Sequence, residues 1–387
     1  MNGLRRLVTA ASVIGLLGAV APIGGAAATA TAGAPLRARH VVHRAQSGFS
    51  FAYADTGGGT ICGSTPDAID VFDAAGNLLQ TYPTGASENC EPFDGLNTIG
   101  LVRTKGANAC LVLADGGMGG GQSGAWDSFA VSTSTGLITR AVSHQADSLG
   151  PNGIVTPPQP MFGTTQTGAI EVMTLKPSCQ LTPPSPEKGD TGLLAAVATL
   201  NVQKQVIAAN SSTGSLDVFN AKLRLLKKNQ ASFSCCVGVA TAGSNPTTIT
   251  ATGRTTVGTA TYAGGKGSIT WGGTATDPSV DGMTRVLVPP SSQCIWTQVD
   301  ANHDSNQLGG VSSFQYHPPQ PGFIGDTLVT GALPEATQYV GGELWSIDRS
   351  IGEIEVSQVN SDCTVTEAAG FAALSDTAGY PTGLAFQ

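Results

Sequence analysis

Short stretches of alternating apolar and polar residues recur along most of the chain. Typical examples are 68–72 (AIDVF), 215–219 (SLDVF) and 343–347 (ELWSI). Similar stretches occupy 127–131, 169–173 and 284–288. A period of two residues indicates β-strands with two different faces, and Gly- or Pro-bearing turns follow most of them. Helical periodicity is almost absent, so the pattern predicts an all-β protein.

The spacing of these stretches indicates a repeated unit. Their middle residues are Asp70, Phe129, Glu171, Asp217, Val286 and Trp345, so the intervals are 59, 42, 46, 69 and 59 residues. Longer echoes support repetition, because residues 157–163 resemble 318–323 and residues 82–85 resemble 380–383. A unit of roughly 40–60 residues with about four strands is typical of a β-propeller blade. Six blades fit the chain best, and seven are possible.

The two ends of the repeat region complement each other. Residues 383–386 (GLAF) resemble the first strand of a blade, as do 150–155, whereas the first blade begins with what look like later strands. A C-terminal strand that completes the N-terminal blade leaves no open sheet edge at the seam. We therefore expect residues 49–387 to form one β-propeller domain, closed by its C-terminal strand.

The blade pattern resembles that of a known group of proteins. The segment Ser128–Thr139 (SFAVSTSTGLIT) is similar to blade segments of bacterial lactonase-type and surface-layer-type β-propeller repeat proteins. The resemblance implies the fold, and no catalytic residue of these families can be matched to a position here. In lactonase-like propellers, channel-facing carboxylates and amides hold a divalent metal. The residues near strand ends that the resemblance suggests for this role are Asp115, Asn152, Asn210 and Asp348.

The N-terminus has the layout of a secretory signal. Arg5 and Arg6 precede an apolar stretch from Leu7 to Ile23, and small residues follow it. We expect a signal peptide over 1–32, a flexible tail over 33–48 and an extracellular mature protein. Pro22 and the following glycines argue against the alternative, a retained membrane anchor, and no later apolar run is long enough to insert in a membrane.

Charge and composition restrict the partners. The formal net charge of −8 becomes −10 when Arg5 and Arg6 are removed, which argues against nucleic acid and anionic membranes. Only 12% of residues are charged, and there are 51 glycines, but the hydrophobic fraction of 41% is sufficient for a core. The expected partner is a small molecule, a glycan or a protein, bound by a monomer.

Eight cysteines follow the predicted signal, and an even number in an exported chain indicates disulfides. They are Cys62, Cys90, Cys110, Cys179, Cys235, Cys236, Cys294 and Cys363. A zinc site is the alternative, but the chain contains no C-x₂-C pair. We expect at least three disulfides, with Cys62–Cys90 the favoured pair.

One loop has the composition of a calcium site. Asp300, Asn302, Asp304 and Asn306 place oxygen atoms at alternate positions, which suits Ca²⁺. The alternative is an ordinary Asp/Asn turn, because these side chains also bond to nearby backbone groups. Relative to a helix-loop-helix calcium loop, the segment lacks the glycine at position six and the glutamate at position twelve.

Other candidate motifs have simpler structural explanations. His144, His303 and His317 share no metal-ligand spacing, and Gly119–Gly124 precedes a predicted strand rather than the helix that a phosphate loop requires. Alternating basic residues at 222–228 suit an outermost strand, where Lys prevents edge pairing. The four tryptophans are expected to pack between blades, although they could also stack on a ligand.

These observations favour a secreted propeller that binds a ligand or partner at the channel mouth. One alternative is a metal-dependent enzyme of lactonase or lyase type, and another is a structural cell-surface protein. Whether the chain is an enzyme stays open. Three or more Asp, Glu, Asn or His side chains that converge in the channel favour an enzyme, whereas walls of Ser, Thr, Gly and apolar residues favour binding.

Overall fold

The structure is a computed structural model, and the part of it described below belongs to the compact unit Arg39–Gln387. The described residues are 48–56, 68–84, 98–103, 108–115, 124–155, 160–165, 167–187, 192, 194–200, 205–242, 248–264, 266–289, 293–317, 320–375, 381 and 383–387. The predicted signal peptide, almost all of the predicted tail, Cys62 and Cys90 lie outside them.

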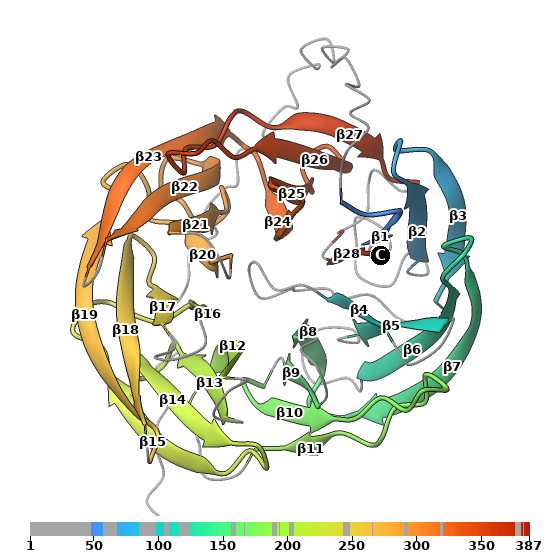
Figure 1. The fold of residues 1–387 in the computed structure, drawn as a ribbon, viewed down its shortest axis with the longest axis horizontal. Coiled ribbons are helices and arrows are strands. Elements are labelled where there is room, and N and C mark those ends of the chain that lie inside the picture. Colours follow the sequence, from blue (N-terminus) through green and yellow to red (C-terminus); the bar gives the residue numbers. More distant parts are fainter. Residues whose placement is uncertain are drawn as a thin grey trace, which may run out of the picture. The chain divides into compact units, whose positions relative to one another are not determined.

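The described residues form seven four-stranded antiparallel sheets, which are the blades of a β-propeller (Figure 1). From the innermost to the outermost strand, the first blade is β28 (Gly383–Phe386), β1 (Phe51–Asp55), β2 (Ala68–Asp73) and β3 (Leu78–Pro83). The second is β4 (Ile99–Arg103), β5 (Asn108–Asp115), β6 (Gly124–Ser132) and β7 (Ile138–Asp147). The third is β8 (Pro151–Val155), β9 (Met161–Thr165), β10 (Ile170–Met173) and β11 (Ser185–Pro186).

The remaining four blades follow in chain order. The fourth is β12 (Leu194–Leu200), β13 (Gln205–Asn210), β14 (Ser215–Asn220) and β15 (Leu225–Gln230). The fifth is β16 (Gly238–Ala242), β17 (Thr248–Thr252), β18 (Thr256–Gly264) and β19 (Ser268–Thr276). The sixth is β20 (Met283–Leu287), β21 (Cys294–Val299), β22 (Leu308–His317) and β23 (Gln320–Thr330). The seventh is β24 (Pro334–Val340), β25 (Glu343–Asp348), β26 (Glu353–Gln358) and β27 (Ala369–Ala373).

The predicted ring closure is confirmed. The C-terminal strand β28 pairs antiparallel with β1, and this register places Phe386 opposite Ala52 and Gly383 opposite Asp55. The innermost strands contact one another in the order β28, β4, β8, β12, β16, β20, β24 and again β28. Leu384 and Phe386 pack into one interblade core, while Ala385 packs into the next.

The number of blades is seven, the second of the two counts considered, and not the favoured six. The fifth blade is rich in Thr and Gly, so its strands do not show the apolar alternation that marked the others. Two stretches that we compared as equivalent also have different places in their blades. Residues 284–288 overlap the innermost strand β20, and 343–347 lie in the second strand β25, whereas 68–72 belong to the third strand β2. Because the compared stretches lie in different strands of their blades, the fifth blade was not recognised within the interval of 69 residues between Asp217 and Val286.

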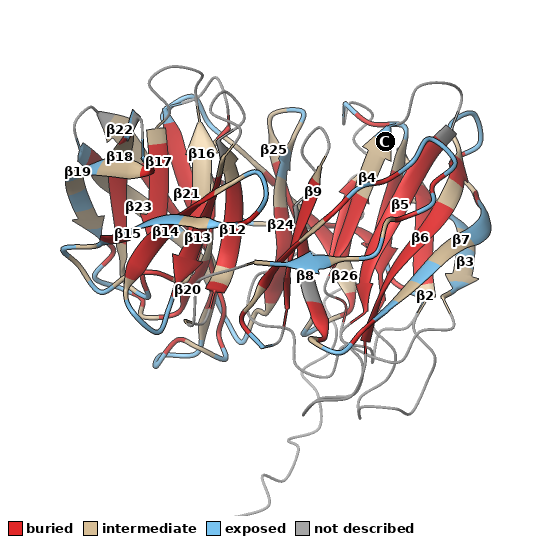
Figure 2. Ribbon diagram, turned by 90° about the horizontal axis from the view of Figure 1, so that it is seen from below, coloured by how far each residue is buried: buried red, intermediate tan, exposed pale blue. Residues whose placement is uncertain are grey.

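The hydrophobic core lies between neighbouring sheets and repeats around the ring. Figure 2 shows buried residues along the inner and middle strands, while outer strands such as β3 and β19 carry exposed positions. Each sheet packs on both faces, which explains why β21 and most of β13 and β14 are continuously buried. At the seam, Phe49 packs edge-on against Trp345, with ring centroids 5.1 Å apart, and lies 4.8 Å from Phe386.

Three disulfides are present among the described residues, in agreement with the expected minimum. Cys110–Cys179 and Cys294–Cys363 each join residues 69 positions apart, with Cα–Cα distances of 5.4 and 5.2 Å. Both connect the second strand of one blade to the turn after the third strand of the next blade. Such a bond holds neighbouring blades together. The third joins the adjacent residues Cys235 and Cys236.

Candidate functional site

The channel wall contains a cavity of about 290 Å³. It is bordered by the innermost strands of four consecutive blades, β8, β12, β16 and β20, which Figure 1 places on the inner side of the ring. Its wall is mainly small and apolar, including Ile154, Val197, Val239, Val286 and Leu287. The volume is close to the lower end of the range for small-molecule sites, and the mixture of apolar walls with a few polar groups is typical of them.

The polar side chains of this cavity are four threonines and one arginine: Thr164, Thr199, Thr241, Thr284 and Arg285. Thr164 is distinctive, because it is buried to 1% exposure and its Oγ1 makes no hydrogen bond. It lies on the second strand β9, opposite Gly153 of the innermost strand. A glycine at that position leaves space beside the Thr164 side chain, so a hydroxyl on the second strand still forms part of the cavity wall.

Arg285 supplies the positive charge of the cavity. It is half-buried on β20, and burial lowers the pKa of its guanidinium to about 10, while the carboxylate of Glu335 on β24 raises it. The side chain is therefore charged at neutral pH. Glu335 is itself buried, and its Oε1 lies 3.5 Å from Nη1 of Arg349. Two arginines thus share the neighbourhood of one buried carboxylate.

A hydrogen-bond network fixes the strands next to Arg285. Gln298 on β21 accepts hydrogen bonds from the backbone N–H and the hydroxyl of Thr337, the latter at 2.8 Å. Its Nε2 donates to Thr284 Oγ1 at 3.3 Å. All three residues are buried. The network joins the sixth and seventh blades, because Gln298 links the strand that carries Arg285 to β24.

Three of the four strand-end residues suggested by the family resemblance do not border this cavity. Asp115, Asn210 and Asp348 end β5, β13 and β25, which are second strands of their blades. Asn210 and Asp348 pair with the first residue of the innermost strand in their blades. Asp55 and Thr165 hold the same place in the first and third blades. The same place in four blades indicates a repeated structural position.

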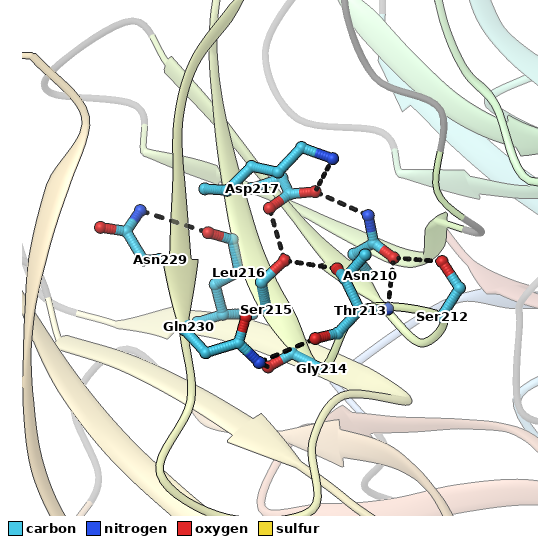
Figure 3. A network of polar contacts seen from close by, with 10 residues as sticks. Asn210, Ser212, Thr213, Gly214, Ser215, Leu216, Asp217, Asn229 and Gln230 are labelled. Atoms are coloured by element: carbon cyan, nitrogen blue, oxygen red, sulfur yellow. Dashed lines mark hydrogen bonds and ion pairs between the residues drawn. The ribbon is translucent and has the colours of Figure 1, made fainter.

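Asn210 illustrates what these residues do (Figure 3). Its Oδ1 accepts hydrogen bonds from the Ser212 hydroxyl at 2.9 Å and the Thr213 N–H at 3.2 Å, and its Nδ2 donates to Asp217 at 2.7 Å. Asp217 also accepts from the Ser215 hydroxyl and lies 3.8 Å from Lys228 Nζ. The group stabilises the turn between β13 and β14. The side chain of Asn152 lies outside the described part.

The predicted calcium loop follows β21 and is bonded mainly to itself. Asp300 Oδ1 accepts the Asn302 N–H at 2.8 Å, and Asp304 Oδ1 accepts the Asn306 N–H at 2.9 Å. Asp304 Oδ2 accepts the Asp281 N–H at 2.9 Å. Among the described residues, no group of three His, Cys, Asp or Glu is arranged to hold a metal ion. Calcium binding by Asp300, Asn302, Asp304 and Asn306 stays a prediction.

The other residues singled out from the sequence have packing or surface roles where they are described. His144 is exposed and lies 2.9 Å from Asp127. Trp126 and Trp296 are fully buried and donate to Glu171 Oε2 and to the Cys363 carbonyl. The basic segment 222–228 leads into and forms part of β15, an outermost strand, as expected. The side chain of His317 is outside the described part.

A buried pair of carboxyl groups was not anticipated from the sequence. The pKa of Glu171 is raised to about 8, chiefly by burial and also by a hydrogen bond with Asp147, while the Trp126 indole acts to lower it. Glu171 is therefore mostly protonated at neutral pH. Its carboxyl can donate a hydrogen bond to Asp147, whose buried Oδ2 has no donor among the described residues.

Comparison with known proteins supports the fold. No protein-family model matches the chain, and no curated protein matches it in sequence. Two putative 6-phosphogluconolactonases, from Bacteroides fragilis and Bacteroides uniformis, have similar structures, each with a TM-score of 0.60. Their sequences are 14% and 15% identical to this one, over 87% of this chain and 98% and 99% of theirs. A functionally unknown protein from Desulfotomaculum acetoxidans aligns with a TM-score of 0.58 and 12% identity, over 87% of this chain and 98% of its own.

At this level of identity the similarity concerns the fold alone. The expected resemblance to lactonase-type propellers is therefore confirmed for the β-propeller architecture. Among the described residues, no helix is long and apolar enough to span a membrane. The chain is a seven-bladed β-propeller whose fold is similar to that of these proteins.

Proposed function

We propose that this protein is an extracellular binding protein that takes a small molecule into the cavity formed by β8, β12, β16 and β20. The observation that carries the proposal is the composition of the wall. The described residues that border the cavity are Gly, Ala, Val, Ile, Leu and Thr, and Arg285 is the single charged residue among them. A wall of Thr, Gly and apolar residues is the composition that we expect for a binding site.

The lactonase-type alternative depends on a different kind of site. A metal that polarises a carbonyl requires carboxylates, amides or imidazoles directed at it, and the bordering residues that the structure describes include none of these. Asp115, Asn210 and Asp348 belong to other positions in the blades. Binding without catalysis is therefore the function that the cavity favours, and incubation with a lactone is expected to give no hydrolysis above the uncatalysed rate.

Extracellular location is part of the proposal and is supported by the disulfides. Cys110–Cys179 and Cys294–Cys363 join neighbouring blades, and disulfides persist in oxidising compartments. The signal-like segment at residues 1–32 is consistent with this.

The test is a thermal-shift screen of the disulfide-bonded protein against a panel of short carboxylates, amides, amino acids and monosaccharides. A ligand that binds only the native state raises the Tm. We expect at least one of these classes to raise it. The response should be lost in Ala240→Leu, because Ala240 borders the cavity and a larger side chain there occupies part of its volume.

A matched substitution elsewhere provides the control. Ala221 is exposed in the turn between β14 and β15, so Ala221→Leu adds the same atoms away from the cavity. It should leave every ligand response unchanged. If no class shifts the Tm, or if the shifts persist in Ala240→Leu, the cavity is not the binding site and the proposal is wrong.

A further inference from the structure

The charge and hydrogen-bonding groups of the cavity indicate which class of ligand it takes, provided that the proposed binding function holds. Arg285 is the only charged residue among the described residues that border the cavity. The carboxylate of Glu335, which favours the charged form of Arg285, also lies 3.5 Å from Nη1 of Arg349. A positive group at a cavity with low-dielectric walls favours an anion.

A second observation at the same cavity is independent of charge. Thr164 Oγ1 is buried, borders the cavity and has no hydrogen-bond partner. A buried hydroxyl without a partner carries a desolvation cost, so such a group in a native structure indicates a missing partner. Because a hydroxyl both donates and accepts, it can donate to a ligand oxygen.

The backbone adds further polar groups to the wall. The strands β8, β12, β16 and β20 are each the edge of their sheet, with a paired neighbour on one side only. Edge strands present N–H and C=O groups on the unpaired side. Most bordering side chains, such as Val197, Val239 and Leu287, nevertheless offer only apolar surface. The ligand must therefore combine an apolar body with a compact polar head.

We propose that the cavity binds a small monocarboxylate with an apolar body, whose carboxylate pairs with Arg285 and accepts a hydrogen bond from Thr164. An arginine binds a carboxylate through two parallel N–H···O bonds, which makes it the better partner for this head group than for a neutral amide. The apolar body contacts the valine, leucine and alanine side chains.

Isothermal titration calorimetry with octanoate, benzoate and the neutral amides octanamide and benzamide tests this inference. The carboxylates should bind about tenfold to a hundredfold more tightly than the amides of the same shape, the factor expected for a hydrogen bond to a charged group. Arg285→Met should reduce carboxylate binding to the level of the amides, and Arg285→Lys should retain part of the difference. Because the first comparison uses the unmodified protein, it decides the question even if Arg285→Met does not fold.

The Thr164 contact has its own matched pair of variants. Thr164→Val keeps the shape but removes the hydroxyl, and it should weaken octanoate binding about threefold to tenfold. Thr297 also has a buried Oγ1 without a hydrogen-bond partner, but it does not border the cavity. Thr297→Val should therefore leave binding unchanged, and equal effects of the two substitutions would overturn the role of Thr164.

The outcomes separate this inference from the proposed function. If amides bind as tightly as carboxylates and all binding is lost in Ala240→Leu, the cavity binds ligands but the anionic class is wrong. If carboxylate binding survives both Arg285→Met and Ala240→Leu, the carboxylate site lies elsewhere and the inference is overturned. If neither the four probes nor the wider panel binds, both the inference and the proposed function are wrong.

Discussion

Individual buried polar residues in this propeller have roles that the sequence alone does not distinguish. Glu171 and Asp217 occupy the same position in their sequence motifs, AIEVM and SLDVF, yet their partners differ. Asp217 accepts hydrogen bonds from Asn210 and Ser215, whereas Glu171 lies against a second carboxyl, Asp147. Likewise, Thr164 and Arg285 were not recognised as site residues, because one Thr among many gives no signal and Arg285 lies within an ordinary strand pattern. Only the three-dimensional partners separate such cases.

The Glu171–Asp147 pair predicts a specific pH dependence of stability. The folded-state pKa of Glu171 is raised to about 8 from an unfolded value of 4.5. Folding therefore takes up a proton between these values, and the contribution of Glu171 to the free energy of unfolding is greatest below about pH 4.5 and is lost as the pH rises through about 8. Glu187 adds to the effect through its negative charge.

Glu171→Gln should remove this contribution to the pH dependence. The amide can still donate to Asp147 and accept from Trp126, so the variant should gain stability relative to the unmodified protein as the pH rises from 5 to 9. Urea unfolding at several pH values measures the difference. The change from Glu to Gln leaves the other titrating groups in place. If the free energy of unfolding has the same pH dependence in the variant and in the unmodified protein, Glu171 is ionised in the folded protein.

At the scale of single elements, strands were easier to predict than their places in a blade. Strands such as β2 and β14 have apolar residues that alternate with a polar one, and they were found correctly. The strands of the fifth blade were missed because Thr and Gly replace most of the large apolar side chains. Thr has a high strand propensity but looks polar in a hydrophobicity pattern. Turns repeat in the same way, since Asn210, Asp300 and Asp348 each accept hydrogen bonds within the turn that follows a second strand.

The turn after β21 gives a prediction that separates hydrogen bonding from calcium binding. Asp304 is buried and accepts the N–H groups of Asp281, Asn306 and Leu308. Asp304→Ala leaves these donors without their acceptor, so it should lower the free energy of unfolding by about 1–3 kcal/mol in buffer that contains EDTA. Urea denaturation in EDTA and in calcium measures this.

Calcium binding is tested with the same samples. A bound ion stabilises the native state, so EDTA should lower the Tm if the loop binds Ca²⁺. The control is the double variant Asn302→Ala with Asn306→Ala. It removes two side chains of the predicted ligand set and keeps the carboxylates of Asp300 and Asp304. If Asp304→Ala destabilises the protein only when calcium is present, the carboxylate acts through an ion and not through the turn.

For the molecule as a whole, the closure of the ring was the feature that the sequence predicted best. A short Gly-Leu-Ala-Phe strand separated from the blade that it completes is recognisable because it matches the first strand of other blades. The cavity was less accessible to prediction. Its walls come from four blades, so the described residues that border it are spread from Gly153 to Val288 and have no common motif.

The C-terminal strand should therefore contribute a large part of the stability of the ring. Leu384 and Ala385 are buried, and the backbone of β28 pairs with four residues of β1. Gln387 adds four hydrogen bonds. Its N–H donates to the Phe51 carbonyl at 2.9 Å, and its carbonyl accepts the Ser50 N–H at 2.7 Å. Its Oε1 accepts the Tyr53 hydroxyl at 2.6 Å, and its Nε2 donates to the Thr133 carbonyl at 3.2 Å.

Deletion of residues 383–387 removes all of these contacts and leaves the inner edge of β1 unpaired. Burial of a large apolar side chain contributes about 1.5–3 kcal/mol, and the total stability of a domain is about 5–15 kcal/mol. We expect the deletion to lower the Tm by more than about 5 °C and to promote aggregation through this newly exposed edge. The matched control removes residues 41–45 from the predicted tail and should melt like the unmodified protein. Equal Tm values for the two truncations would mean that pairing of β28 with β1 is not needed for a stable ring, and that the remaining three strands of the first blade close it sufficiently.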